Sequence, residues 1–203
     1  MIICSDVDGV ILNYIQGFID FTSEENISYQ YNPEVYGVIT GVENAEHMRS
    51  KFYAKDYLCK LQYYEGALEV LNRLVEQHEV HLVTAIQPEC SEMRSENLSA
   101  LNYSSLQCVG DAAKERIIVE EVVPDIMIED RPILIRAFHS AGIPVFYPAN
   151  VDEVITLGLQ AFALSRHAGI CVALKITSDT ADSNAVIDLG KLRPNSQKLD
   201  PPI

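Results

Sequence analysis

Residues 1–10 read MIICSDVDGV. The apolar run Met1 to Ser5 has the length of a buried strand, and Gly9 favours a turn after it. Asp6 and Asp8 lie two residues apart where the strand passes into a loop, so their side chains can project to the same side. One carboxylate can then attack a phosphorus atom while the other gives or takes a proton. An ordinary Asp-Gly turn is the alternative for these residues taken alone.

Apolar runs of strand length recur further along the chain. Residues 80–84, 125–128 and 144–147 each predict a short buried strand, and 170–176 is a further candidate. Helical patterns separate these runs, and the clearest of them begins at Gly66. Strands that alternate with helices indicate an α/β fold, here a Rossmann-like parallel sheet with helices on both faces.

Residues 14–63 differ in composition and hydrophobic pattern from the rest of the chain. They are rich in tyrosine and phenylalanine and show no clean strand alternation. We therefore expect a small helical cap inserted after the first strand. The core is then expected to comprise residues 1–13 and 64–165, and residues 166–203 to form a C-terminal tail of unknown role.

Polar residues follow the ends of other predicted strands. Thr84 ends one strand, and Glu129 and Asp130 follow another. Ligands of parallel sheets bind at the carboxyl ends of the strands, so we expect these side chains near Asp6. Converging carboxylates repel one another unless a cation is present, and Mg²⁺ prefers oxygen ligands of this kind. As the alternative, Asp130 and Thr84 only cap the helices that follow them.

In order and spacing, these positions resemble the four motifs of the haloacid dehalogenase-like (HAD) hydrolase superfamily. The resemblance covers about residues 1–150. It rests on residues 6–10, the strand that ends at Thr84, Lys114, and residues 128–130. It implies a Rossmann-like core and catalysis through an aspartyl-phosphate intermediate.

The resemblance also implies the roles of the four acidic residues. Asp6 would be the nucleophile and a metal ligand. Asp8 would be the acid/base and would give the metal its backbone carbonyl. Asp130 would complete the Mg²⁺ site, with Glu129 as a second ligand or as a support behind the ligands.

The phosphoryl group would be held by Thr84, Ala85 and Lys114 according to the same resemblance. A lone lysine such as Lys114 is otherwise most often a solvated surface residue. The aspartate at position 8 is similar to the phosphatases of the superfamily rather than to its dehalogenases.

A finer similarity points to the 5'(3')-deoxyribonucleotidase branch. It rests on YYEGA at residues 63–67, TAI at 84–86 and EDRP at 129–132. That branch usually has Thr-Ser-Pro at the second position and often Asp-Asp at the third. Together, the two resemblances imply a phosphomonoesterase for a (deoxy)nucleoside monophosphate or another small phosphorylated metabolite. A non-catalytic HAD-like protein that binds a phosphorylated ligand is the alternative.

Helical pieces are predicted over 14–22 and 44–60 within the expected cap. Phe18, Phe52 and Tyr53 are its candidate specificity residues, because aromatic rings can stack on a base. A small helical domain also needs aromatics to build its own core, and we favour that role for any single one of them.

The net charge of −14 bears on the partners of the chain. It argues against a nucleic-acid polymer or an anionic membrane, since both need a basic face. A small phosphorylated substrate remains compatible, because a metal ion and one lysine can make a pocket locally positive. The sequence leaves the oligomeric state open.

The first residues of the chain, its longest apolar stretch and its cysteines suggest a cytoplasmic protein. The first residues do not resemble a signal peptide. The longest apolar-leaning stretch, 154–164, is far shorter than the roughly 20 residues of a membrane-spanning helix. The five cysteines are odd in number and lack metal-ligand spacing, which favours free thiols in a reducing compartment.

Overall fold

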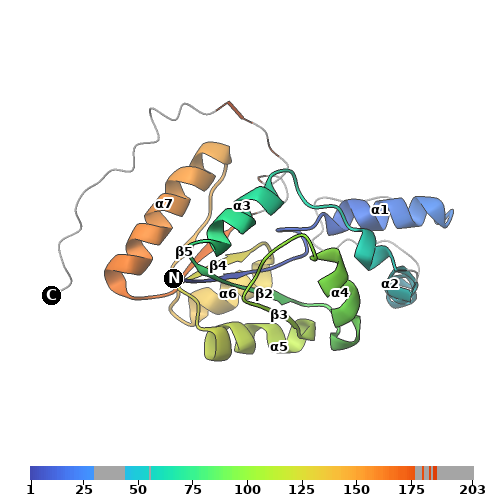
Figure 1. The fold of residues 1–203 in the computed structure, drawn as a ribbon, viewed down its shortest axis with the longest axis horizontal. Helices are drawn as coiled ribbons and strands as arrows, with labels where there is room; N and C mark the ends of the chain where they lie inside the picture. Colours follow the sequence, from blue (N-terminus) through green and yellow to red (C-terminus); the bar gives the residue numbers. More distant parts are fainter. Residues whose placement is uncertain (30–43, 55, 177–179, 181–182, 184, 187–203) are drawn as a thin grey trace.

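The computed structural model describes residues 1–29, 44–54, 56–176, 180, 183 and 185–186. These residues form one parallel sheet of six strands, in the order β3-β2-β1-β4-β6-β5, with helices on both sides (Figure 1). The strands are β1 (Ile2–Ser5), β2 (Glu79–Thr84), β3 (Ser105–Cys108), β4 (Ile126–Glu129), β5 (Val145–Phe146) and β6 (Val172–Lys175). The predicted α/β class and Rossmann-like sheet are confirmed.

The helices fall into those of the core and those of the segment inserted after β1. The core has α3 (Ala67–Val75), η2 (Pro88–Cys90), α4 (Ser91–Asn97), α5 (Gly110–Arg116), the π-helix η3 (Ile117–Val122), α6 (Pro132–Ser140) and α7 (Val151–Ala168). The insertion has α1 (Tyr14–Glu24), α2 (Ala45–Ala54) and η1 (Tyr57–Lys60).

Strand β1 lies inside the sheet, between β2 and β4. Successive side chains of a strand point to opposite faces, so Ile3 packs into one hydrophobic cluster and Cys4 into the other. The first cluster includes Leu71 of α3, and the second includes Phe138 of α6. This burial on both faces fixes the end of β1, and with it the direction in which Asp6 leaves the sheet.

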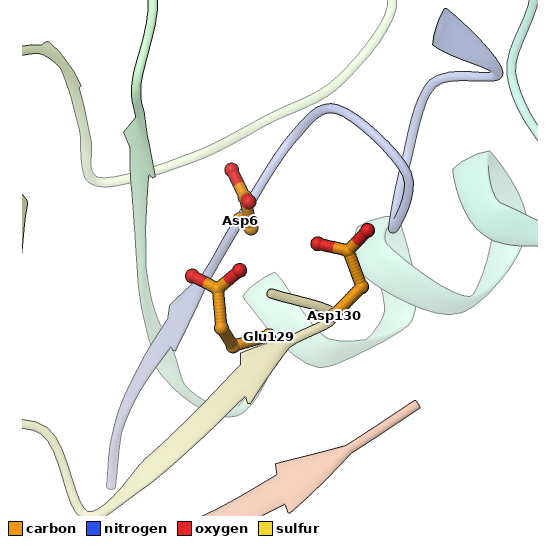
Figure 2. A group of neighbouring side chains, drawn as sticks. All are labelled: Asp6, Glu129 and Asp130. Atoms are coloured by element: carbon orange, nitrogen blue, oxygen red, sulfur yellow. The ribbon is translucent and has the colours of Figure 1, made fainter. Parts of the chain in front are cut away.

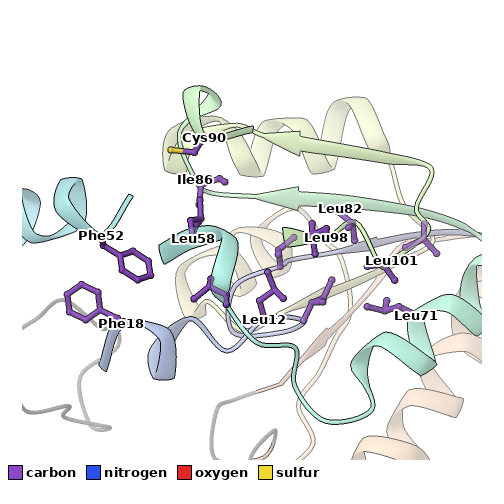
Figure 3. Close-up of a cluster of buried hydrophobic side chains, with 14 of the residues drawn as sticks. Leu12, Phe18, Phe52, Leu58, Leu71, Leu82, Ile86, Cys90, Leu98 and Leu101 are labelled. Atoms are coloured by element: carbon purple, nitrogen blue, oxygen red, sulfur yellow. The ribbon is translucent and has the colours of Figure 1, made fainter. Parts of the chain in front are cut away.

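The inserted segment adds a group of packed aromatic rings to the first hydrophobic cluster. Asn13 begins α1, and its side chain accepts a hydrogen bond from the Gln16 amide at 3.0 Å. The rings of Phe18, Phe21 and Phe52 are fully buried and lie 5.4–5.6 Å apart between centroids. Figure 3 shows Phe18 and Phe52 facing each other, away from the leucines under α3.

The structure differs from the sequence prediction within the inserted segment. Over residues 44–60, α2 ends at Ala54 and η1 follows, because Asp56 adopts a left-handed φ of 57°. Between β2 and β3, the single turn η2 precedes α4, which ends at Asn97.

The structure continues the core beyond residue 165, where the sequence analysis places the start of the tail. Helix α7 continues to Ala168, and β6 then pairs with β4 on one side and β5 on the other. The first part of the expected tail is thus an interior strand of the core sheet. Most of the tail beyond Lys175, and residues 30–43 of the cap, lie outside the described residues. Among the helices that are described, none combines the length and apolarity needed to cross a membrane.

Candidate active site

Three carboxylates converge where β1 and β4 end. Asp6 follows β1, Glu129 is the last residue of β4, and Asp130 follows it. Each offers one oxygen within 4.8 Å of the others, and all three residues are buried. Figure 2 shows the carboxyl groups pointing into the same space between the two strand ends. The structure therefore brings together the acidic residues that the strand pattern placed at one edge of the sheet.

A buried lysine on α5 contacts two of these carboxylates. The Nζ atom of Lys114 lies 2.6 Å from Asp6 Oδ2 and 2.8 Å from Glu129 Oε2. Lys114 is fully buried, which rules out the alternative of a solvated surface lysine. The Val7 amide donates to Asp6 Oδ1 at 2.6 Å, and the Arg131 amide donates to Glu129 Oε1 at 3.0 Å. Both carboxylates are therefore held in fixed orientations.

The charges of this cluster shift its pKa values. Burial lowers the pKa of Lys114, but the Asp6 and Glu129 carboxylates outweigh burial and raise it overall, so the ammonium stays charged. Burial and then the Asp6 charge raise the pKa of Glu129 well above its ordinary value, and raise the pKa of Asp130 to about 7. One ammonium group cannot balance three carboxylates, so a proton or a divalent cation must neutralise the remainder.

Asp8 belongs to a second group of side chains. Its two carboxylate oxygens accept hydrogen bonds from Arg94 Nη2 at 2.6 and 2.7 Å. The hydroxyl of Thr84, at the end of β2, donates to Asp8 Oδ2 at 3.3 Å. Burial raises the pKa of Asp8, and the Arg94 guanidinium opposes that rise. Thr84 thus contacts the expected acid/base, while Ala85 follows it half-buried in the loop after β2.

The arginine of this group has no counterpart among the residues predicted from the sequence. Arg94 lies on α4, whose sequence SEMRSEN has no apolar face. Its side chain is nonetheless fully buried, with a relative accessibility of 0%. No local pattern marks such a residue as buried, because its burial depends on packing of α4 against η1 and the Asp8 loop.

The three cap residues proposed for specificity occupy different environments. Phe18 and Phe52 are fully buried among the packed aromatic rings of the cap, where a ligand base has no access to their rings. Tyr53 is half-buried, with its hydroxyl 3.5 Å from that of Tyr14. Burial raises the pKa of Tyr53, and the Asp8 charge adds to the rise. Of the three, Tyr53 is therefore the one whose side chain is not fully buried.

Gly9 is required by the geometry of the acidic cluster. Its φ is +82°, and a Cβ atom added there would overlap Asp130 Oδ2 and lie 3.0 Å from Asp130 Cγ. Glycine thus lets the loop after Asp8 pass directly over the Asp130 carboxylate.

We expect Gly9→Ala to displace Asp130 and to reduce the activity of the site strongly. Gly142→Ala is the matched control, because Gly142 has a φ of +80° and no atom within 4 Å of the added Cβ. The control should lose about 1 kcal/mol of stability from its backbone conformation alone and keep full activity. Thermal unfolding and the activity of each variant relative to the wild type measure the two effects. Equal activity in both variants would contradict the role assigned to the Gly9–Asp130 contact.

Comparison with known proteins identifies the fold. Models of protein families give no match to this chain, and curated protein sequences give none either. Among solved structures, the chain is similar to a haloacid dehalogenase-like family hydrolase from Streptococcus pneumoniae, with a TM-score of 0.55, 13% identity, and coverage of 72% of this chain and 84% of that one. It is also similar to the HAD hydrolase YfnB from Bacillus subtilis bound to magnesium, with a TM-score of 0.51, 14% identity, and coverage of 72% and 87%. The chain therefore has the fold of the HAD-like hydrolases, as its motifs predict.

Proposed function

We propose that this chain is a magnesium-dependent phosphomonoester hydrolase in which Asp6 is the nucleophile. The observation that supports it best is the environment of Asp6. The Asp6 carboxylate follows the end of β1 and contacts Lys114 and the Val7 amide. It lies beside the buried acids Glu129 and Asp130. A nucleophilic carboxylate needs this combination of fixed orientation and nearby positive charge.

The acidic cluster fits a magnesium ion. We expect Asp6 and Asp130 to be its side-chain ligands, together with the backbone carbonyl of Asp8. Glu129 contacts Lys114 through Oε2 and accepts a hydrogen bond from the Arg131 amide through Oε1, and we propose it as a second ligand or as a support that holds Lys114 behind the ligands. A bound Mg²⁺ would neutralise the excess negative charge and withdraw electrons from the phosphoryl oxygens.

The reaction would proceed in two steps on the residues of this chain. An Asp6 oxygen attacks phosphorus, the bond from phosphorus to the ester oxygen breaks, and Asp8 gives its proton to the departing alcohol. Water then attacks the aspartyl phosphate, Asp8 takes a proton from that water, and inorganic phosphate leaves with Asp6 restored. Lys114 remains charged throughout and stabilises the oxygens of Asp6 and the phosphoryl group.

The substrate we propose is a small phosphorylated metabolite, with (deoxy)nucleoside monophosphates as the leading candidates. Since Phe18 and Phe52 are buried within the cap, neither supports base stacking. Tyr53 is half-buried and is the remaining one of the three candidates for contact with a leaving group.

A magnesium-containing panel of phosphate esters tests this function. It should include p-nitrophenyl phosphate, dUMP, dTMP, AMP and several sugar phosphates, with phosphate release measured with Mg²⁺ and with EDTA. We expect release from at least one ester with Mg²⁺ and none with EDTA. The second candidate function, binding of a phosphorylated ligand without catalysis, is favoured if the protein binds such esters but releases no phosphate from any of them.

Stabilisation by Mg²⁺ is expected to increase between pH 6 and pH 8. The pKa of Asp130 is raised to about 7 by burial and by Asp6, whereas an unfolded aspartate has a pKa of about 3.9. In the metal-free protein, this group therefore stabilises the fold fully below about pH 4, and the contribution is lost as the pH rises through 7. A metal ion needs the ionised carboxylate, so protons compete with it below pH 7.

Thermal unfolding at pH 6, 7 and 8, with Mg²⁺ and with EDTA, measures this effect. The difference in Tm between the two conditions should be smallest at pH 6. A difference that stays constant or falls toward pH 8 would show that Mg²⁺ does not displace a proton from this cluster.

A further inference from the structure

Arg94 is a fully buried arginine beside the proposed acid/base. Buried arginines are rare unless they are paired, because removing a guanidinium from water is energetically costly. Here the Nη2 atom contacts both oxygens of Asp8, at 2.6 and 2.7 Å. The Asp8 side chain keeps 21% of its surface exposed, whereas Arg94 keeps none. Arg94 is thus wholly covered by protein, whereas part of the Asp8 side chain stays open to solvent.

Arg94 is itself held from the side of the cap. Its Nη1 atom donates to Asn97 Oδ1 at 3.4 Å. The Asn97 amide donates in turn to the backbone oxygens of Cys59 and Leu61, both at 2.9 Å. These two residues belong to the segment in which the chain returns from the cap to the core. A chain of hydrogen bonds thus connects this returning segment with the Asp8 carboxylate.

Lys114 and Arg94 contact different carboxylates. Lys114 contacts Asp6 and Glu129, while Arg94 contacts Asp8. The orientation of Asp8 is therefore set by groups other than those that hold the nucleophile: Arg94 on α4, and the Thr84 hydroxyl on β2.

We propose that Arg94 is a positioning residue for proton transfer, which holds the Asp8 carboxyl group in the orientation that reaches the oxygen of the leaving group. This inference rests on the proposed phosphomonoesterase function. In the ion pairs that the structure describes, Arg94 contacts Asp8 while Asp6 is paired with Lys114, so its removal is expected to leave attack by Asp6 in place. It misaligns only the group that gives the proton to the departing alcohol.

The consequence is a dependence on the leaving group. A nitrophenolate departs without much help from an acid, whereas an alkoxide needs a proton as its bond to phosphorus breaks. Loss of Arg94 should therefore slow hydrolysis of an alkyl phosphate much more than hydrolysis of p-nitrophenyl phosphate. A general loss of folded protein would slow both by the same factor.

The experiment compares kcat/KM for p-nitrophenyl phosphate and for an alkyl phosphate that the wild type hydrolyses in the ester panel. The variants are Arg94→Met and Arg94→Lys. Arg73→Met is the matched control, because Arg73 is exposed and pairs with Glu69 four residues before it. We expect Arg94→Met to lose about tenfold more activity on the alkyl ester than on the aryl ester, within the range of general acid catalysis. Arg94→Lys should recover part of that difference, and Arg73→Met should match the wild type.

The outcomes separate the two proposals. If the wild type hydrolyses both esters and the Arg94 variants lose both equally, the positioning role is overturned while the proposed function stands. If the wild type hydrolyses neither, both are overturned. Arg94→Lys keeps a buried cation opposite Asp8, so it provides the same comparison of esters if Arg94→Met does not fold.

Discussion

Asparagine in place of Asp6 is expected to reduce kcat for every phosphate ester by a factor on the order of 10⁴ or more. The amide has nearly the volume of the carboxylate but lacks its negative charge, so it cannot form the bond to phosphorus. It can still accept a hydrogen bond from Lys114 at the position of Oδ2, which lies 2.6 Å from Nζ in the wild type. The fold should therefore persist while the first chemical step is lost. Phosphate release under saturating substrate measures the effect.

Asp20→Asn is the matched control for this substitution. Asp20 is exposed on α1, and its carboxylate accepts a hydrogen bond only from Gln16 among the bonds that the structure describes for it. The control should have wild-type activity, and both variants should give a circular dichroism spectrum like that of the wild type. An Asp6→Asn protein that keeps a tenth or more of the activity would exclude Asp6 as the nucleophile.

The fold was largely predictable because its signals are local. Short apolar runs separated by helical patterns indicated β1, β2, β4 and β5 and the alternation of a parallel sheet. The order of the strands depends on pairing between distant residues, which no local pattern contains. Strand β6 illustrates this: residues 170–176 suggested a strand, but only its pairing with β4 and β5 makes it part of the core.

The site was predictable where function coincides with the ends of strands. Asp6, Thr84, Glu129 and Asp130 all follow or end a buried strand, so the topology alone brings them to one edge of the sheet. Lys114 was found through the family resemblance, since nothing in its own helix marks it as buried.

Arg94 shows the limit of this reasoning. It lies in a short polar helix and contacts Asp8, which is 86 residues away along the chain. Only the packing of α4 against the Asp8 loop and η1 buries it. The aromatic residues of the cap were ambiguous for the opposite reason, because burial in a small core and stacking on a base require the same side chains.

Methionine in place of Lys114 is expected to lower the stability of the metal-free protein by about 3–5 kcal/mol, the usual cost of leaving a buried ion pair without one partner. For a chain of this size, that is a decrease in Tm of roughly 10 °C. The Asp6 and Glu129 carboxylates lie 2.6 and 2.8 Å from Nζ and would lose their shared cation. Activity should be lost as well, because the phosphoryl group loses the same charge.

A divalent cation should compensate for part of this loss. The variant keeps all three carboxylates of the cluster, so Mg²⁺ can supply the positive charge that the ammonium no longer provides. We therefore expect the increase in Tm from Mg²⁺ to be larger in Lys114→Met than in the wild type. Adding Glu129→Gln, which removes one of the unpaired charges at constant volume, should restore stability without restoring activity.

Thermal unfolding of these proteins with EDTA and with Mg²⁺ tests the electrostatic account directly. Lys60→Met is the control for loss of a lysine. Lys60 is exposed, and its Nζ lies 4.8 Å from the centre of the Tyr57 ring. It pairs with no carboxylate in the ion pairs that the structure describes. The control should unfold within a few degrees of the wild type. If Lys114→Met also unfolds at the wild-type temperature in EDTA, the carboxylates must be neutralised by protons instead. The raised pKa values of Glu129 and Asp130 would then reflect uncharged groups, and Lys114 would be needed for catalysis alone.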